Sequence, residues 1–231
     1  MHTDRRLPTA SLYLVALLFC LALAVPRGPA MADDATEARA LVESAKVTLE
    51  NFLADENLGW FHDNVGKAKG VLIVPQLLKG GFLVGASGGS GVFLVRDEKT
   101  GQWSYPAFYT MGSVSFGLQI GAQAAEVILM VTTEKGIDAF LSNKFQLGAD
   151  VGLAAGPVGA GAQAATADIL AFSRAKGLYG GVSVEGAVIA VRDSLNAAYY
   201  GREATPVDIL IKQSVVNRHA DPLRRILMRL R

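Results

Sequence analysis

The sequence contains few of the residues that carry covalent or metal chemistry. Its 231 residues include one cysteine, three histidines and two tryptophans. The cysteine, Cys20, lies near the N-terminus, so the chain beyond residue 32 has no disulfide, no thiolate nucleophile and no cysteine metal site. Only His62 and His219 remain in that part, too few for a histidine-based transition-metal centre. We therefore expect no metal and no cofactor.

A strong excess of either charge is also missing. The formal net charge of the whole chain is +1. Because residues 1–32 hold three basic residues and one acidic residue, residues 33–231 carry 19 basic and 20 acidic residues. A protein this close to neutrality has no general attraction for polyanions. Nucleic acid is not an expected partner, and any anion-binding site must be a local cluster of basic side chains.

The longest apolar run lies at the N-terminus, in residues 11–25. It is too short to favour a membrane-spanning helix, which needs about 20 apolar residues. Arg5 and Arg6 precede it, and the small residues Ala30 and Ala32 follow it, which is the pattern of a cleaved secretion signal. We expect residues 1–32 to be removed and the protein to be exported to the periplasm, either free or peripheral to a membrane.

Glycine, in contrast, is abundant, with 25 residues, and much of it occurs inside β-type sequence between residues 67 and 121. Glycine weakens a strand and usually marks a bulge, a bend or the close approach of another backbone. This pattern predicts a strongly coiled, barrel-like antiparallel β-sheet rich in Gly and Ala. We expect Gly117 and Gly121 to lie where a side chain would collide with a neighbouring strand.

Helices are expected on both sides of this sheet. Residues 33–55 place apolar side chains at helical spacing and begin with acidic residues, which suit the positive end of the helix dipole. This helix either packs on the sheet or lies on a membrane, and its acidic polar face favours packing. Thr205 and Pro206 begin a second helix, expected to span 206–216. The predicted fold is thus α+β: a single domain over 33–216 with a β-rich core at 67–201.

Within this core, further elements follow from local patterns. Residues 85–91 are expected to form a hairpin turn between strands at 82–84 and 92–95, and residues 97–101 a polar turn. The remaining predicted elements are strands at 127–131, 168–172 and 182–191 and a short helix at 134–141.

Two motifs resemble catalytic or cofactor signatures. Gly85-Ala-Ser87-Gly-Gly89 matches the G-x-S-x-G nucleophile elbow, which places a serine between a strand and a helix. Here β-type residues follow the serine, so a serine hydrolase is the least favoured hypothesis. The glycines at 159–164 resemble a dinucleotide fingerprint but lack the apolar strand that should precede it. We expect no catalytic residue.

An aromatic cluster offers a different kind of site. It could hold a ligand, lie at a membrane interface or pack in the core, and core packing is favoured because large aromatic side chains dominate core energetics. The cluster comprises Trp103, Tyr105, Phe108 and Tyr109.

The C-terminal segment 217–231 is basic and amphipathic, with five arginines against one aspartate. Leu223, Ile226, Leu227 and Leu230 share one helical face. This is the pattern of a helix that lies on a membrane surface. A helix that caps the sheet explains it equally well, since arginines are favoured at a helix C-terminus.

Short segments spread over residues 68–210 resemble the SYLF family, the lipid-binding domain of endocytic adaptors, which has exported bacterial relatives. They include Gly80-Gly-Phe82, Trp103-Ser-Tyr-Pro106, Phe116-Gly-Leu-Gln-Ile-Gly121 and Gly181-Val-Ser-Val-Glu-Gly186. The resemblance implies a non-enzymatic protein of the bacterial cell envelope that binds phospholipid headgroups or a membrane surface. The alternative is a structural or protein-interaction module of the periplasm, which would bind through a sheet edge or the aromatic cluster.

Anionic phospholipids or a membrane surface are thus the expected partners, and no protein partner can be named. The residues expected to contact lipid flank strand ends or lie in the C-terminal segment. Solvated turns explain the first group equally well. The candidates are Lys67, Lys69, Lys79, Arg174, Lys176, Arg224, Arg225, Arg229 and Arg231.

The export hypothesis makes a direct prediction about the processed N-terminus. Cleavage after Ala32 leaves Asp33 as the first residue, because Ala30 and Ala32 satisfy the small-residue requirement of the signal peptidase. N-terminal sequencing of the protein recovered from its native cells checks this. A lipid-modified N-terminus at Cys20, or an uncleaved chain, would contradict it.

Overall fold

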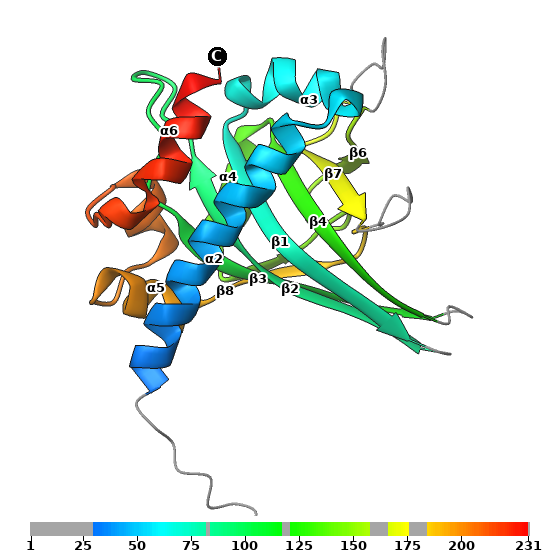
Figure 1. Cartoon of the computed structure of the whole chain (residues 1–231), viewed down its shortest axis with the longest axis horizontal. Coiled ribbons are helices and arrows are strands. Elements are labelled where there is room, and N and C mark those ends of the chain that lie inside the picture. Colours follow the sequence, from blue (N-terminus) through cyan, green and yellow to red (C-terminus); the bar gives the residue numbers. More distant parts are fainter. Residues whose placement is uncertain (1–29, 82–83, 117–120, 158–165, 176–183, 231) are drawn as a thin grey trace, which may run out of the picture. The chain divides into compact units, whose positions relative to one another are not determined.

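An eight-stranded sheet, curled into a half-barrel, forms the centre of the fold (Figure 1). The computed structural model describes residues 30–81, 84–116, 121–157, 166–175 and 184–230, and residues 31–231 form one unit. The strand order is β5-β8-β3-β2-β1-β4-β7-β6. The strands are β1 (Gly70–Gly81), β2 (Val84–Val95), β3 (Ala107–Phe116), β4 (Gly121–Val131), β5 (Lys144–Gln146), β6 (Leu153–Ala155), β7 (Ile169–Ala175) and β8 (Val188–Val191).

The predicted α+β class and curled sheet are confirmed, with helices from both ends of the chain flanking the sheet. All neighbouring strands are antiparallel except β6 and β7, which are parallel. The helical elements are α2 (Ala30–Leu53), η1 (Glu56–Leu58), α3 (Gly59–Asn64), η2 (Val65–Lys67), α4 (Glu134–Leu141), α5 (Asp193–Tyr200), the π-helical η3 (Val207–Ile211), η4 (Arg218–Ala220) and α6 (Asp221–Arg229).

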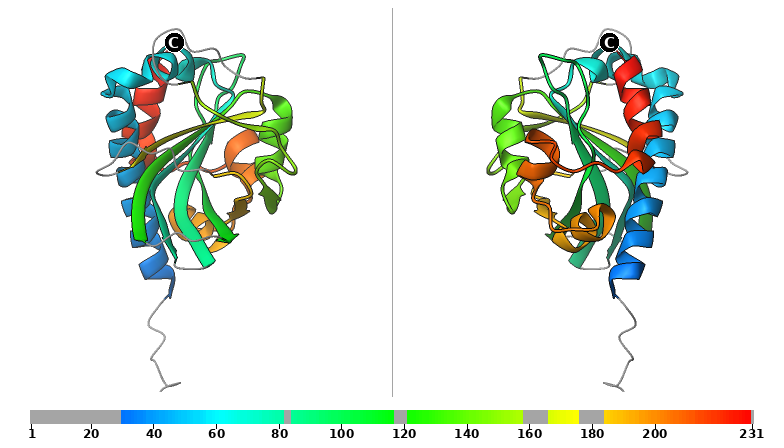
Figure 2. Two further views of the ribbon diagram at one scale, coloured as in Figure 1. Left: turned by 90° about the vertical axis from the view of Figure 1, so that its right-hand side faces the viewer. Right: turned by 90° about the vertical axis from the view of Figure 1, so that its left-hand side faces the viewer.

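Each face of the sheet has its own apolar core. Figure 2 shows α2 and α6 on one side of the sheet and α4 on the other. Along β1, Val71 and Ile73 point into the core beneath α2, and Leu72 and Val74 point into the core beneath α4. This alternation follows from the two-residue period of a strand. Because both faces are covered here, the strands are apolar on both sides.

Helix α2 packs on the sheet, as its acidic polar face predicted. Its buried residues recur at helical spacing: Ala38, Val42, Ala45, Leu49 and Phe52. The helix α4 matches its predicted bounds at both ends. Thr133 caps it, because its hydroxyl accepts a hydrogen bond from the Gly136 amide at 3.1 Å.

The curl of the sheet depends on a bulge in β1. The pairing of β1 with β4 shifts between Val74 and Leu77. Pro75, which has no amide hydrogen to donate, lies within this bulge. The bulged backbone presses on β2: a Cβ at position 91 would lie 2.6 Å from the Ile73 carbonyl oxygen, so glycine is required there. The predicted close approach of strands is thus found at Gly91.

Several predicted boundaries were wrong. Residues 85–91 belong to β2, where all of them pair with β3 and residues 85–88 also pair with β1, so they form no turn. Pairing on both sides outweighs the turn preference of their glycines. In the described part of the predicted strand at 182–191, residues 184–191, only β8 forms, and the helix at 206–216 is reduced to η3. Helix α5 was not predicted. Gly117 lies outside the described residues, and Gly121 begins β4.

We predict that Gly91→Ala lowers the free energy of unfolding by about 1–3 kcal/mol, the usual scale of overpacking. The added methyl group must displace the backbone of β1, which cannot move without distorting the bulge. Gly59→Ala in α3 is the matched control, since a Cβ there meets no atom within 4 Å. Chemical denaturation measures both variants, and equal midpoints would contradict the prediction.

Candidate functional site

The nine candidate basic residues do not form one cluster. Lys176 and Arg231 lie outside the described residues. Lys67 and Lys69 precede β1, whereas Lys79 lies near its other end, in register with Ser87 of β2 and Gln123 of β4. The first nine residues of β1, residues 70–78, therefore separate the first two lysines from the third.

Lys69 is occupied by acidic partners. Its Nζ lies 2.7 Å from Glu134 Oε1 and also contacts Glu98. The hydrogen bond to Glu134, together with that to Glu98, raises the pKa of Lys69. Two carboxylates thus offset its charge, and Lys69 is a poor candidate for binding an anion.

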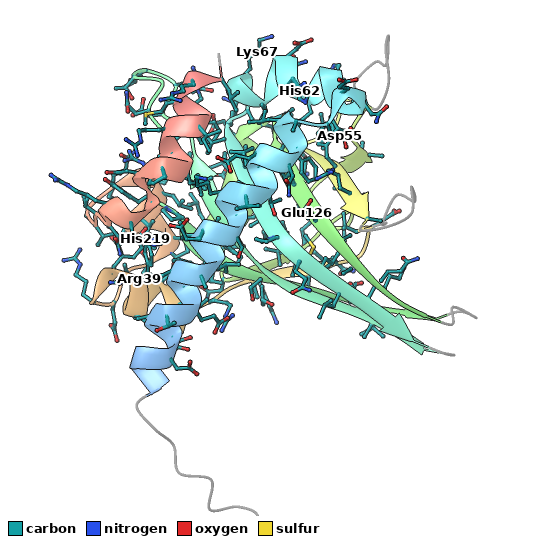
Figure 3. The ribbon with its side chains drawn as sticks, in the orientation of Figure 1. Arg39, Asp55, His62, Lys67, Glu126 and His219 are labelled. Carbon is teal, nitrogen blue, oxygen red and sulfur yellow. The ribbon has the colours of Figure 1, made fainter. Side chains whose placement is uncertain are left out.

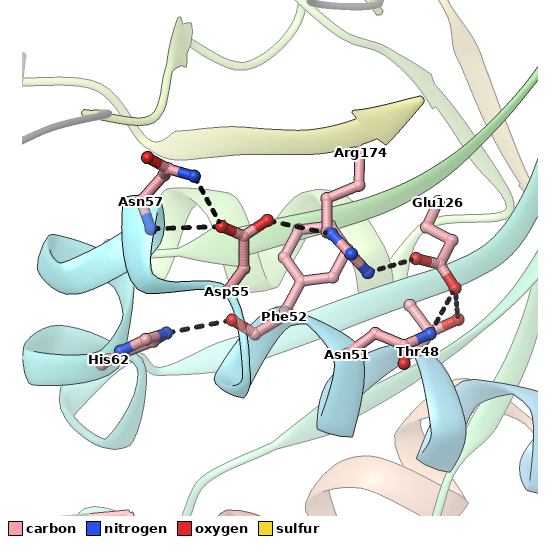
Figure 4. Close-up of polar contacts among 8 residues, drawn as sticks. All are labelled: Thr48, Asn51, Phe52, Asp55, Asn57, His62, Glu126 and Arg174. Atoms are coloured by element: carbon pink, nitrogen blue, oxygen red, sulfur yellow. Dashed lines mark hydrogen bonds and ion pairs between the residues drawn. The ribbon is translucent and has the colours of Figure 1, made fainter. Parts of the chain in front are cut away.

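Arg174 is likewise engaged, in a polar network that fastens α2 to the sheet (Figure 4). Its Nε lies 3.1 Å from Asp55 Oδ2, and its Nη1 lies 3.0 Å from Glu126 Oε2. Glu126 is only 6% exposed and also accepts hydrogen bonds from Thr48 and Asn51 of α2. A buried carboxylate is stable only when it is paired in this way. Arg174 therefore has a structural role.

The carboxyl group of Asp55 responds to the same network. Burial by itself would raise its pKa, but hydrogen bonds from Asn57 and the adjacent guanidinium of Arg174 outweigh burial and lower it. The carboxylate therefore contributes stability above its unfolded pKa, and that contribution is lost as the pH falls through its lower folded-state pKa. At neutral pH the pair is fully formed.

Arg224 fixes α6 to the sheet. Its guanidinium lies 3.9 Å from the centroid of the Tyr105 ring and donates hydrogen bonds of 3.0 and 2.7 Å to the Trp103 carbonyl oxygen. Its Nη1 also lies 3.1 Å from Asp221 Oδ1. This arginine satisfies a backbone carbonyl and a carboxylate inside the fold, so it is not available to a ligand.

The apolar face of α6 is buried. Leu223 and Leu227 belong to the core beneath α2, and Ile226 and Leu230 pack against that core. The structure therefore shows the capping arrangement for this segment, and the alternative, in which these leucines enter a membrane, is wrong for the folded domain.

Apart from Lys79 at the other end of β1, the remaining described candidates, together with Arg218, define what we call the basic α6 surface: Lys67, Arg218, Arg225 and Arg229. All four are exposed, and none has an ion pair with another residue in the described part of the chain. Arg218, Arg225 and Arg229 recur at helix-like spacing through η4 and α6.

Lys67 lies in η2, which contacts α6, at the end of the domain where α6 ends (Figure 3). The nearby carboxylate of Glu43 is engaged with His219, at 3.2 Å. Two of the four cations, Arg225 and Arg229, thus lie on a helix whose apolar face is already buried, and Arg218 and Lys67 lie in η4, which precedes that helix, and in η2, which contacts it.

The aromatic cluster is part of the core, as favoured from the sequence. Trp103, Phe108 and Tyr109 are buried, and Tyr105 is partly buried beneath Arg224. Burial also raises the pKa of Tyr109. These side chains offer no exposed platform for a ligand.

Ser87 lies within β2, where its hydroxyl is 2.7 Å from that of Ser113 on β3. The strand-to-helix turn of a nucleophile elbow does not occur at this position. The glycines at 159–164 lie outside the described residues. In the described ranges, no group of three or more His, Cys, Asp and Glu residues could hold a metal ion. Nor does any described helix have the length and hydropathy needed to span a membrane.

Comparisons with known proteins identify the family of the chain. A family model described as "Ysc84: Las17-binding protein actin regulator" matches residues 112–230. The chain belongs to the Ysc84, or SYLF, family. Protein YSC84 of Saccharomyces cerevisiae is 36% identical over 169 residues, which cover 70% of this chain and 36% of that protein.

Two further relatives of this SYLF chain extend the comparison. LAS seventeen-binding protein 3 of the same yeast is 35% identical over 173 residues, 71% of this chain and 37% of its own length. Human SH3 domain-containing YSC84-like protein 1 is 29% identical over 169 residues, 71% of this chain and 49% of its own length. The chain thus spans between a third and a half of these relatives, none of which is named as an enzyme. No solved structure matches the chain significantly.

We predict that Leu227→Ala lowers the free energy of unfolding by about 2–5 kcal/mol, the range for truncating a buried leucine. Leu227 is fully buried, and its truncation would leave a cavity in the core that α6 shares with α2. The matched control, Arg229→Ala on the exposed face of the same helix, should change stability by less than about 0.5 kcal/mol. Thermal or chemical denaturation tests this, and equal stability of the two variants would show that α6 is not docked.

Proposed function

We propose that this SYLF domain is a non-enzymatic module that binds the surface of membranes containing anionic phospholipids through the basic α6 surface. The observation that carries the proposal is the set of four exposed cations, Lys67, Arg218, Arg225 and Arg229, without a described ion-pair partner. Most other basic candidates in the described residues are engaged inside the fold. A local group of unpaired cations is what anion binding requires in a protein of nearly zero net charge.

The mode of binding follows from the burial of the leucines of α6. Since they are already packed in the core, the helix can contact a membrane only with its arginines. Binding would therefore be electrostatic adsorption to headgroups, with each cation near an anionic surface contributing about 1 kcal/mol. Salt should weaken such binding, because exposed charges are screened over about 10 Å at 0.1 M ionic strength.

Protein interaction is the second candidate, and the names of the family and of one relative favour it. The family description and one yeast relative both name binding to a protein, Las17 or LAS seventeen. The two routes expected from the sequence have little support, however. The aromatic cluster is buried, and the edge strands β5 and β6 have three residues each, which is short for strand addition by a partner.

We further propose that the domain works outside the cytoplasm, in the periplasm of the cell envelope. The support is the pattern of residues 1–32, a charged start, an apolar run and a small-residue cleavage site. In that compartment the headgroups of a membrane leaflet are the natural anionic surface for the basic α6 surface.

We predict that the double variant Arg225→Gln/Arg229→Gln binds anionic vesicles about 10- to 30-fold more weakly, the loss expected for two charges worth about 1 kcal/mol each. Co-sedimentation with phosphatidylglycerol-containing vesicles measures this, with neutral phosphatidylcholine vesicles as the reference lipid. The control Lys99→Gln/Lys144→Gln removes two exposed charges elsewhere and should bind as the unaltered chain does.

Higher salt should reproduce the effect of the double variant in the unaltered protein. Thermal stability should not change, since both arginines are exposed and unpaired among the described residues. Equal loss in the control pair, or binding that ignores lipid charge, would reject the basic α6 surface as the site.

A further inference from the structure

No described helix covers the α2 side of the sheet where the long strands extend past α2. In Figure 1, β1, β2 and β4 run beyond this helix to a free end. Three large apolar side chains are exposed on the α2 side of this region: Leu78 by 54%, Val114 by 68% and Val188 by 42%. An exposed group of large apolar residues in one place usually marks an interaction surface.

This region carries almost no charge. Residues 77–91 and 107–125 contain a single charged residue, Lys79. Lys79 is in register with Ser87, which pairs with Ser113, and these three side chains lie on the opposite face of the sheet from Leu78. None of the residues of these ranges on the α2 side is therefore charged, and the nearest described ion pair on this face is Arg192–Glu37, whose arginine contacts Ser90 at its border.

Gly88 at the centre of this face is not explained by the fold. A Cβ at position 88 would meet no atom within 4 Å, and the residue does not have the positive φ that favours glycine. Its neighbour Gly89 is different, because a Cβ there would lie 2.4 Å from the Gln76 carbonyl oxygen. A glycine inside a strand lowers stability unless another backbone or a ligand approaches closely. At Gly88 no group in the described part of the domain does so.

The sizes of the side chains on this face have a two-fold pattern. The strand register places one row of residues across five strands, from β4 to β8. Consider a second copy of this row, rotated about a two-fold axis parallel to β2 and placed face to face with the first. Leu78 of one copy then lies over Gly112 of the other, and Ala124 lies over Val188. The row is Ala124, Leu78, Gly88, Gly112 and Val188.

The next row repeats this relation. Gly80, Ala86 and Val114 are in register across β1, β2 and β3. The same rotation places Val114 over Gly80 and Ala86 over its own copy. In both rows, each large side chain lies opposite a smaller one, and Gly88 falls on the axis where the two backbones are nearest.

We propose that this face binds a second copy of the same chain, forming a two-fold symmetric dimer in which Leu78 and Val114 of each copy fill the spaces above Gly112 and Gly80 of the other. An isologous contact requires a self-complementary surface, and this one is complementary in size. It is also uncharged, so two copies do not repel each other. A lipid surface would require exposed apolar side chains but not this alternation of large and small residues or the open glycine.

The dimer would leave the proposed lipid-binding surface free. The free end of β1 and β2 and the helix α6 lie at different ends of the domain (Figure 1). Dimerisation therefore does not depend on lipid binding, and failure of one proposal leaves the other standing.

Sedimentation velocity of the whole chain over a range of concentrations tests the proposal with the variant Gly88→Arg. We expect the unaltered chain to be dimeric at micromolar concentration and Gly88→Arg to associate at least 10-fold more weakly. The arginine enters open space in the single domain, so its far-ultraviolet circular dichroism should be unchanged. The matched control Gln123→Arg adds the same side chain to the opposite face of the same region and should remain dimeric.

A cross-linking experiment locates the axis. In a Cys20→Ser background, Gly88→Cys should form a covalent dimer on oxidation or with a short bis-maleimide, because the two thiols meet at the axis. Gln123→Cys should remain a monomer on denaturing gels. A monomeric unaltered chain at 100 µM, or equal association of the two arginine variants, would overturn the proposal. Weaker vesicle binding by Gly88→Arg with no change in association would instead identify lipid as the occupant and would also overturn it.

Discussion

The close contact between the β1 bulge and β2 is the constraint on which the rest of the structure depends. At Gly91 the backbone of β2 passes so near the Ile73 carbonyl that a Cβ would lie 2.6 Å from the oxygen. At this contact the pairing of β2 with β1 is interrupted by the bulge, which increases the local twist of the strands, while β2 stays paired with β3. The coiled sheet then offers one face to α2 and α6 and the other to α4, and the two cores follow from that division.

The contacts that hold these helices on the sheet determine which basic side chains remain without a partner. Arg174 joins β7 to Asp55 and the buried Glu126, and Arg224 holds α6 against the Trp103 carbonyl. Both contacts provide partners for buried polar groups that would otherwise be unpaired. The two arginines are therefore not available to bind a ligand at the surface. Arg225 and Arg229 lie one and five residues further along α6 and have no ion-pair partner among the described residues. The same helix thus supplies both a structural and a surface cation.

Local signals were predictable from the sequence, whereas long-range pairing was not. The predicted bounds of α4 are those of the structure, where its cap at Thr133 involves residues only three positions apart in the sequence. The turn predicted at 85–91 failed because glycine is common to turns and to closely packed strands, and only pairing with β3 decides between them. The use of Arg174 depends on Asp55, 119 residues away in the sequence, and no local pattern reports such a contact. Glu126, a lone carboxylate in an apolar strand, was the available hint of a buried network.

The glycines of β2 differ in whether contacts within the single domain require them. Gly89 and Gly91 are required by the backbone of β1, so the fold of a single domain accounts for them. Gly88 lies between strands that would accept a side chain, yet it gives up the stability that alanine would add to a strand. The described contacts within the single domain do not explain that loss. A second backbone that approaches at this position accounts for it, and it also accounts for Leu78 and Val114, whose exposure costs solubility without contributing to either core.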